Sequence, residues 1–231
     1  MLIGGIQKLT LLDYPGRVAA TIFTVGCNFR CPFCHNAPLV NRVDKNSFID
    51  KGEILQFLKK RVGILDGVVI TGGEPTLMSD LPEFISEIKA MGYSVKLDTN
   101  GTDPEILEYL INNKMIDYVA MDIKNCLEKY CDTAGVDRSF NLDAIKRSAD
   151  ILMQNKVDFE FRTTVVLPYH TEEDFDRIGE WLAGDEKFFL QAFVDSGNLV
   201  GDGVHGATKE EMLTFCNKLK QYVKNAQIRG I

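Results

Sequence analysis

The chain has 231 residues, of which 45% are hydrophobic and 26% charged, which suits one large α/β domain with a sizeable core. Its formal net charge of −7 argues against a protein that binds nucleic-acid backbones through a basic face. No run approaches the ~18 apolar residues of a membrane helix, and the N-terminus lacks the basic start and apolar middle of a signal peptide. Six cysteines without a secretory signal therefore predict a reducing, cytoplasmic compartment.

Short apolar runs alternate with amphipathic segments along the chain. The apolar runs predict strands at Val18–Val25, Gly67–Thr71, Tyr93–Thr99, Tyr118–Ile123, Val157–Leu167 and Lys187–Val194. The amphipathic segments predict helices at Ile49–Val62, Asp80–Met91, Asp103–Asn113, Leu142–Asn155, Thr171–Ala183 and Thr208–Asn225. We expect a single domain over 1–231, with an N-terminal extension (1–17), six β/α units (18–194), and a loop and C-terminal helix (195–231). The Gly-rich stretch Ser196–Ala207 predicts a loop.

Six β-then-α units in succession predict a parallel sheet with helices outside it. Right-handed crossovers curl such a sheet, and six units are fewer than the eight of a closed barrel. The expected fold is therefore an open, partial (β/α)₆ barrel, with a doubly wound sheet as the alternative. The unusual polar residues follow the predicted strands, and the carboxyl ends of barrel strands share the face that carries the site.

Cys27, Cys31 and Cys34 form a C-x₃-C-x₂-C motif directly after the first predicted strand. Three thiolates on one short loop can hold an iron–sulfur cube by three corners, and a closed cluster usually takes four. The fourth iron then keeps an open position, which is the mark of a reactive metal site. Zinc and plain packing remain alternatives, although the adjacent His35 is badly placed as a fourth zinc ligand. The other cysteines lack cluster spacing: Cys126, Cys131 and Cys216.

The segment Gly72-Gly73-Glu74-Pro75 follows the second predicted strand. Gly and Pro often make a tight turn and nothing more, but glycines also let the backbone approach a ligand closely. A free carbonyl here could accept a hydrogen bond from an ammonium group, and Glu74 could fix the turn. With the cysteine loop before it, we interpret the turn as part of a binding site.

Charged residues lie at the ends of the next predicted strands: Asp98, Asp122, Lys124 and Arg162. The aspartates could simply cap helices or turn into solvent. The two cations could pair with surface carboxylates, which contributes little to stability. As ligands of a bound carboxylate, Arg offers a bidentate fork and Lys a point charge.

Together, the C-x₃-C-x₂-C motif and Gly72-Gly73-Glu74-Pro75 resemble the radical S-adenosylmethionine (SAM) enzymes, and Phe33 fits the aromatic residue before their third cysteine. Four further segments are similar to the glycyl-radical-enzyme activating enzymes: Asp13-Tyr14-Pro15-Gly16, Cys34-His35-Asn36, Asp98-Thr99-Asn100-Gly101 and Asp122-Ile123-Lys124. Gly4–Lys8 and Phe161–Thr164 are most similar to the activating proteins of anaerobic ribonucleoside-triphosphate reductase. The likeness covers nearly the whole chain.

The resemblance implies a partial (β/α)₆ barrel that holds one 4Fe–4S cluster on Cys27, Cys31 and Cys34. It implies that the reduced cluster cleaves SAM to a 5′-deoxyadenosyl radical, which takes hydrogen from a glycine Cα of a partner protein. No catalytic residue is expected beyond cluster and SAM. The implied cofactor-binding residues are Phe33, Gly72, Gly73, Glu74, Asp98, Thr99, Asp122, Lys124 and Arg162. Asp98, Thr99 and Asp122 also match positions that hold a monovalent cation beside the methionine carboxylate.

The implied protein substrate is a glycyl radical enzyme, an anaerobic ribonucleoside-triphosphate reductase, and the implied electron donor is flavodoxin- or ferredoxin-like. Neither nucleic acid nor a membrane is an expected partner. We expect the partner's glycine loop to meet Asp13–Gly16, the cysteine loop and the region of His170. Two alternatives stay open: a radical SAM enzyme acting on a small molecule, and a non-catalytic iron–sulfur electron-transfer protein. Gly72–Pro75 argues against the second, because a carrier needs no methionine-binding turn.

Overall fold

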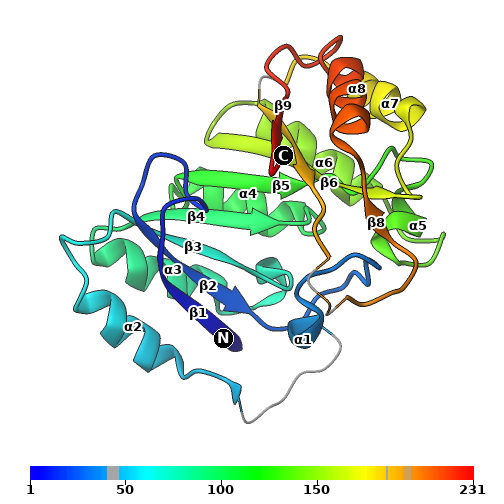
Figure 1. The fold of residues 1–231 in the computed structure, drawn as a ribbon. Coiled ribbons are helices and arrows are strands. Elements are labelled where there is room, and N and C mark those ends of the chain that lie inside the picture. Colours follow the sequence, from blue (N-terminus) through cyan, green and yellow to red (C-terminus); the bar gives the residue numbers. More distant parts are fainter. Residues whose placement is uncertain (41–46, 186, 196, 198) are drawn as a thin grey trace.

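Parallel strands lie side by side in the order in which they occur in the chain: β2 (Ala19–Thr24), β3 (Gly67–Gly72), β4 (Ser94–Thr99), β5 (Tyr118–Asp122), β6 (Asp158–Leu167) and β7 (Phe188–Ala192). The structure is a computed structural model that describes residues 1–40, 47–185, 187–195, 197 and 199–231 (Figure 1). A doubly wound sheet reverses its strand order at a switch point. The uninterrupted order therefore rules out that alternative.

Two further strands extend the sheet at its edges. β1 (Ile3–Thr10) pairs antiparallel with β2, and β9 (Gln227–Arg229) pairs parallel with β7. In the described part of the chain these two edge strands are not paired with each other, so the barrel stays open. The predicted partial barrel is thereby confirmed. Its sheet takes β1 from the N-terminal extension, β2 to β7 from the six β/α units, and β9 from the C-terminal region.

The amphipathic segments form helices that pack against the strands: α2 (Lys51–Lys59), α3 (Leu81–Ala90), α4 (Pro104–Asn112), α6 (Asp143–Met153), α7 (Glu172–Trp181) and α8 (Lys209–Leu219). Their apolar faces share one core with alternate strand residues, such as Ile70 and Leu97. Local signals set the helix starts. Asp103 accepts a hydrogen bond from the Ile106 amide ahead of Pro104 at the first helical position. None of the described helices has both the length and the apolar character that crossing a membrane requires.

Several short elements were not predicted: β1, α1 (Ala37–Val40), α5 (Tyr130–Ala134), β8 (His205–Gly206) and β9. Each depends on a neighbour distant in sequence more than on its own pattern. β8, for example, pairs two residues with the end of β6. It lies in the predicted loop Ser196–Ala207, of which residues 196 and 198 fall outside the described residues. Gly201 in this loop donates a hydrogen bond to the Pro32 carbonyl, 2.9 Å away, and so holds the loop against the cysteine segment.

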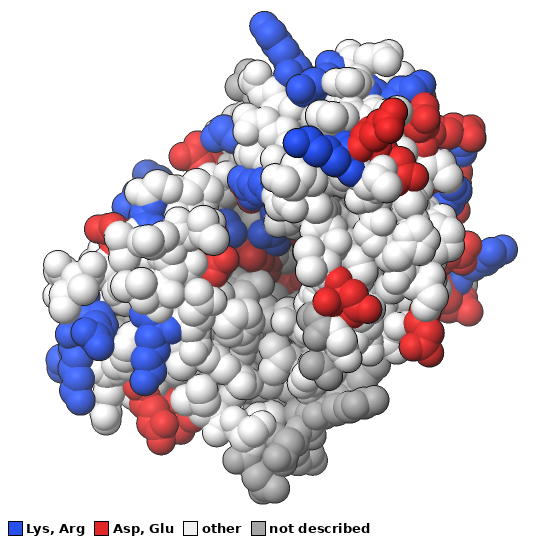
Figure 2. Space-filling view, viewed as in Figure 1, with Lys and Arg blue, Asp and Glu red and all other residues white. Residues whose placement is uncertain are grey.

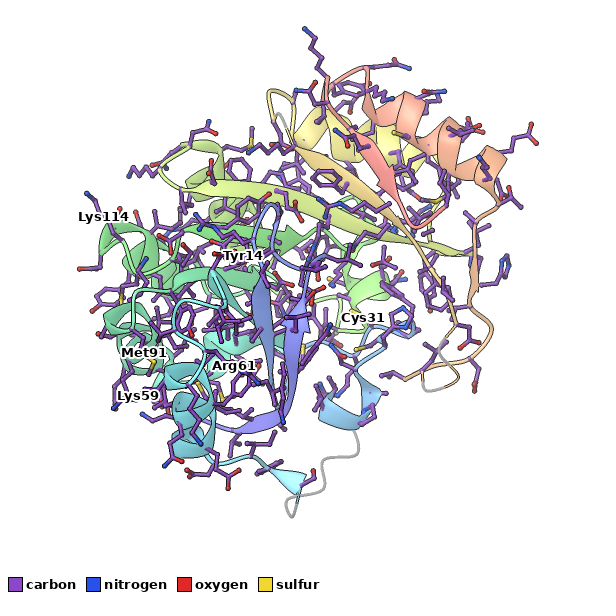
Figure 3. The ribbon with its side chains drawn as sticks, turned by 60° about the vertical axis from the view of Figure 1, so that its left-hand side comes forward. Tyr14, Cys31, Lys59, Arg61, Met91 and Lys114 are labelled. Atoms are coloured by element: carbon purple, nitrogen blue, oxygen red, sulfur yellow. The ribbon has the colours of Figure 1, made fainter. Side chains whose placement is uncertain are left out.

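The segment Asp13–Gly16 lies at the amino end of the barrel strands, opposite the end that carries the cysteine loop, and its expected contact with a substrate loop stays a prediction. A Cβ on Gly67, the first residue of β3, would lie 2.9 Å from the Tyr14 ring. Tyr14 is buried with Ala19, Val69 and Tyr118, an apolar cluster that fills this end of the barrel. In Figure 3 the segments before β2, β4 and β5, marked by Tyr14, Met91 and Lys114, lie to the left of Cys31, which follows β2.

Candidate functional site

A cavity of about 230 Å³ opens at the carboxyl ends of strands β2 to β7. Figure 2 shows a hollow near the middle of this face, with acidic and basic side chains together at its rim. The cavity lining includes every residue expected to hold the cluster or the cofactor: Cys27, Cys31, Phe33, Cys34, Gly72, Gly73, Glu74, Asp98, Thr99, Asp122, Lys124 and Arg162. The fold therefore brings these strand-end residues together at one face, as the strand-end rule predicts.

The cysteine loop is shaped by its own backbone and by helix α5. The Phe29 amide donates a hydrogen bond to Cys27 Sγ at 3.3 Å, and such N–H···S bonds tune the potential of thiolate-bound clusters. The thiol of Cys31 faces the Ala134 carbonyl at 3.6 Å, and the Arg30 amide donates to that same carbonyl at 2.9 Å. Helix α5, missed from the sequence, thus supports the loop that carries the cysteines.

Burial raises the pKa of two of the three thiols. The pKa of Cys31 rises to about 12 because the side chain is buried away from water. Burial also raises the pKa of Cys27, despite the hydrogen bond from Phe29. Without a bound metal these two thiols therefore stay protonated near neutral pH. Binding of a cluster must release their protons, so cluster affinity should increase with pH.

The cysteine set fits an iron–sulfur cube better than a single metal ion. Over the residues that the structure describes, no three or more His, Cys, Asp or Glu side chains are gathered as one ion's ligands. A cube spreads its thiolates over separate irons, so it does not need them to converge on one point. The thiol of Cys126 faces Asp174 at 3.4 Å, in the buried packing of α7. That arrangement supports no second cluster.

The Gly72–Pro75 turn is interlocked with the start of the cysteine loop. The amides of Gly73 and Glu74 donate to the carbonyls of Thr24 and Gly26, at 2.9 and 2.8 Å. A Cβ on Gly73 would lie 1.9 Å from the Gly26 carbonyl oxygen, so only glycine fits there. The Asn36 side chain, not predicted as a site residue, donates to the Gly72 carbonyl at 2.8 Å. That carbonyl is therefore engaged within the protein.

Glu74 fixes this turn to the end of β4 from a fully buried position. Its Oε1 accepts hydrogen bonds from the Thr76 amide and hydroxyl and from the Thr99 hydroxyl, at 3.1, 2.7 and 2.7 Å. Its Oε2 accepts from the Asn100 amide at 2.6 Å. Burial raises the pKa of Glu74 even though these bonds favour the charged form. The carboxylate thus supports the cavity wall through protein contacts.

We expect Glu74→Gln to destabilise the apoprotein by about 1–3 kcal/mol, the cost of an unsatisfied buried polar group. Both oxygens of Glu74 accept hydrogen bonds, so the NH₂ group of glutamine faces a donor in either orientation. It meets the Asn100 amide on one side, or the donors around Oε1, such as the Thr99 hydroxyl, on the other. Urea unfolding measures the change. Glu83→Gln is the matched control, because Glu83 is exposed and pairs with Lys51, and its change should stay within about 0.5 kcal/mol. Equal stability of Glu74→Gln and wild type would contradict this account of the turn.

The charged residues form one network across β4, β5 and β6. Arg162 Nη1 lies 3.2 Å from Asp98 Oδ2, and Arg162 Nε lies 3.0 Å from Asp122 Oδ1. Lys124 Nζ lies 3.2 Å from Asp122 Oδ2. Burial alone would raise the pKa of Asp122, but Arg162 and Lys124 outweigh it and hold that pKa at about 2. Asp122 is therefore ionised at neutral pH, and its carboxylate in turn raises the pKa values of both cations.

Other side chains around the cavity have structural explanations. His170 is buried, with Nε2 2.9 Å from the Lys124 carbonyl and Nδ1 at the Val166 backbone. Burial lowers its pKa, so it is a neutral link between the ends of β5 and β6.

Asn100 donates to Asn28 at 2.8 Å and so ties β4 to the cysteine loop. The sequence signalled Asn100 through its Asp-Thr-Asn-Gly segment, although only Asp98 and Thr99 were taken as site residues.

Lys96 is the charged residue that sequence reasoning missed. It lies on β4, is 1% exposed, and its ammonium contacts Asp98. Its signal was present in the sequence. Alternation along a strand puts residues two apart on the same face, so Lys96 had to face the same interior as Asp98.

Comparison with known proteins gives concordant results for family and fold. The family model described as the Radical SAM superfamily matches residues 21–182 of this chain. Two proteins of Methanocaldococcus jannaschii, both named as glycyl-radical enzyme activating enzymes, are similar in sequence. One is 34% identical over 239 residues, covering 100% of this chain and 96% of its own. The other is 26% identical over 189 residues, covering 77% of this chain and 68% of its own.

Solved structures with this fold have lower identity. A radical SAM methyltransferase from Sphaerobacter thermophilus aligns with a TM-score of 0.73 at 13% identity, over 96% of this chain and 68% of its own. Streptococcus suis SuiB bound to S-adenosylmethionine aligns with a TM-score of 0.65 at 16% identity, over 90% of this chain and 51% of its own. At these identities the structures show the shared fold alone.

Proposed function

The chain belongs to the radical S-adenosylmethionine superfamily, and from that premise we propose that it is an activating enzyme that installs a glycyl radical on a partner protein. The observation that carries the proposal is that Cys27, Cys31 and Cys34 line the same cavity as the Gly72–Gly73 turn. An electron carrier needs the three cysteines but has no need of the turn. The proteins named as glycyl-radical enzyme activating enzymes support this choice over other radical SAM reactions.

In this proposal Cys27, Cys31 and Cys34 hold one 4Fe–4S cluster and leave one iron open for SAM. When bound and reduced, the cluster would supply the electron that cleaves the S–C5′ bond of SAM, so that the 5′-deoxyadenosyl group could take hydrogen from the partner's glycine Cα. The chain contributes position and electrostatics. Cys31 is buried while Cys27 and Cys34 are partly exposed, and no described side chain is required as a general base.

The charged network gives the cavity a polarity that suits the methionine part of SAM. Lys124 and Arg162 present cationic groups for a carboxylate, as a point charge and a planar fork. The backbone of Gly72 and Gly73 forms a close-fitting wall for the amino group, and Thr99 and Glu74 fix that wall. Phe33, buried beside Tyr169, supplies an apolar surface between the cysteines.

The protein substrate in this proposal is a glycyl radical enzyme, with an anaerobic ribonucleoside-triphosphate reductase as the specific partner. The cavity opens at the surface of an incomplete barrel, so a loop of another protein can reach it. A flavodoxin- or ferredoxin-like protein supplies the electron. We assign the reaction to the cytoplasm, because all six cysteines are unpaired thiols and a reducing compartment keeps them so.

The direct test follows one hydrogen atom. The reconstituted, reduced protein is incubated under anaerobic conditions with SAM and a glycyl-loop peptide of an anaerobic ribonucleoside-triphosphate reductase, deuterated at the glycine Cα. We expect deuterium in the 5′-deoxyadenosine and a carbon-centred radical on the peptide. A peptide deuterated at another residue is the control. We expect weak peptide binding, because a flexible loop must first be ordered.

The rival functions predict different results. If deuterium reaches 5′-deoxyadenosine from a small metabolite and never from the peptide, the chain is a small-molecule radical enzyme. If it transfers electrons without ever forming 5′-deoxyadenosine, it is an electron carrier. Either result would overturn the proposed activation of a glycyl radical enzyme.

A further inference from the structure

A lysine ammonium lies inside the barrel, beside an aspartate expected to serve the cofactor. Lys96 is 1% exposed, a burial that lysines rarely have unless they are paired. It projects from the same face of β4 as Asp98, two residues on, and its Nζ contacts Asp98 Oδ1. Because Lys96 is part of strand β4, its ammonium stays next to Asp98, whereas a free ion could dissociate.

Every carboxylate oxygen of Asp98 and Asp122 has a positively charged partner. Lys96 and Arg162 contact the two oxygens of Asp98. Arg162 and Lys124 contact the two oxygens of Asp122. Three cations against two carboxylates leave this group with one excess positive charge. The next carboxylate on β6, Glu160, does not offset it, because Arg229 binds both of its oxygens at 2.8 Å.

The monovalent cation implied by the family resemblance does not fit this arrangement. Potassium and sodium are hard ions that prefer oxygen ligands, but the aspartate oxygens are already occupied by Lys96, Arg162 and Lys124. A further positive charge would also be repelled by the excess charge of the network, and repulsion is strong where water is scarce.

We propose that the Lys96 ammonium replaces a monovalent cation at Asp98, so that this chain binds its cofactor without depending on potassium or sodium. This step rests on the proposed function only in taking SAM as the cofactor. Lys96 acts as a positioning residue: it holds the Asp98 carboxylate against Arg162, and Arg162 in turn is held in place to receive the carboxylate of the ligand. Removing Lys96 leaves Asp98 Oδ1 without a partner and opens space where a free cation can bind.

The first experiment measures the apoprotein alone, so it does not depend on cluster or SAM. Wild type, Lys96→Met, Lys96→Arg and Lys218→Met are melted in potassium, sodium and tetramethylammonium chloride at equal ionic strength. Lys218 pairs with Asp176 at 3.0 Å between α7 and α8, far from the cavity, and serves as the matched control. We expect equal melting temperatures in all three salts for every protein except Lys96→Met. Potassium or sodium should raise its melting temperature by about 2–5 °C over tetramethylammonium.

The second experiment measures SAM affinity of the reconstituted proteins in the same salts. We expect the wild-type dissociation constant to be the same in each, and that of Lys96→Met to be about tenfold weaker in tetramethylammonium and restored by potassium. Lys96→Arg, which keeps the charge, should behave like wild type. A wild-type protein whose melting temperature or affinity needs potassium or sodium would overturn the proposal, even if Lys96→Met did not fold. If SAM binds to no variant in any salt, the proposed function fails, and the melting experiment alone decides the role of Lys96.

Discussion

Replacing Cys31 by alanine should abolish the iron–sulfur cluster. Anaerobic reconstitution of the wild type should give about four irons per chain, as a single 4Fe–4S cluster requires. Because only three cysteines line the described cavity, the loss of one leaves two thiolates, which cannot hold a cube. Iron analysis, together with the spectrum of the reduced protein under electron paramagnetic resonance, measures the result. Iron loading of the variant should fall to near zero.

Cys216 offers a matched control for this substitution. Like Cys31 it is buried, and its thiol also faces a backbone carbonyl at 3.6 Å, that of Ala226. Cys216→Ala should therefore lose a similar amount of stability, about 1–2 kcal/mol, while it keeps its full complement of iron. Normal iron loading in Cys31→Ala would contradict the cluster assignment. Equal iron loss in both variants would show that general destabilisation was the cause.

The convergence of the site was predictable because it follows from a local rule. Each of the chosen residues comes at or just after the end of an apolar run, and parallel strands bring such positions to one face. Cys27 after β2, Gly72 at the end of β3 and Asp122 at the end of β5 needed no knowledge of distant contacts. The same rule, applied to Asp13–Gly16, gives the amino end of the barrel, because that segment precedes its strand.

The elements that escaped prediction are those whose stability comes from partners far along the chain. β1 carries Gly4 and Gly5, which weaken a strand signal, and it forms only because β2 is there to pair with it. Helix α5 is five residues long and depends on its contacts with the cysteine loop. No periodicity in so short a segment could have indicated it. Lys96 differs, since strand alternation alone would have assigned it to the interior.

Replacing Gly73 by alanine should strongly weaken SAM binding. The added Cβ would lie 1.9 Å from the carbonyl oxygen of Gly26 and 2.5 Å from its carbonyl carbon. Since these are backbone atoms, no side-chain rotation relieves the overlap. The Gly72–Pro75 turn and the start of the cysteine loop must move apart. We expect a loss of about 1–3 kcal/mol in the free energy of unfolding, and a fall in SAM affinity of about 100-fold, the scale of a misplacement near 1 Å.

The overlap also presses on the residue before Cys27, so iron loading has to be measured in the same sample. The decisive quantity is the change that SAM causes in the electron paramagnetic resonance spectrum, normalised to the amount of reduced cluster. We expect a clear change in wild type and none in Gly73→Ala. Gly5→Ala is the control, because a Cβ there meets its nearest atom, in Phe23, at an ordinary 3.7 Å. If Gly73→Ala responds to SAM as the wild type does, this turn does not form the wall of the cofactor site, and the methionine part of SAM must bind against other residues of the cavity.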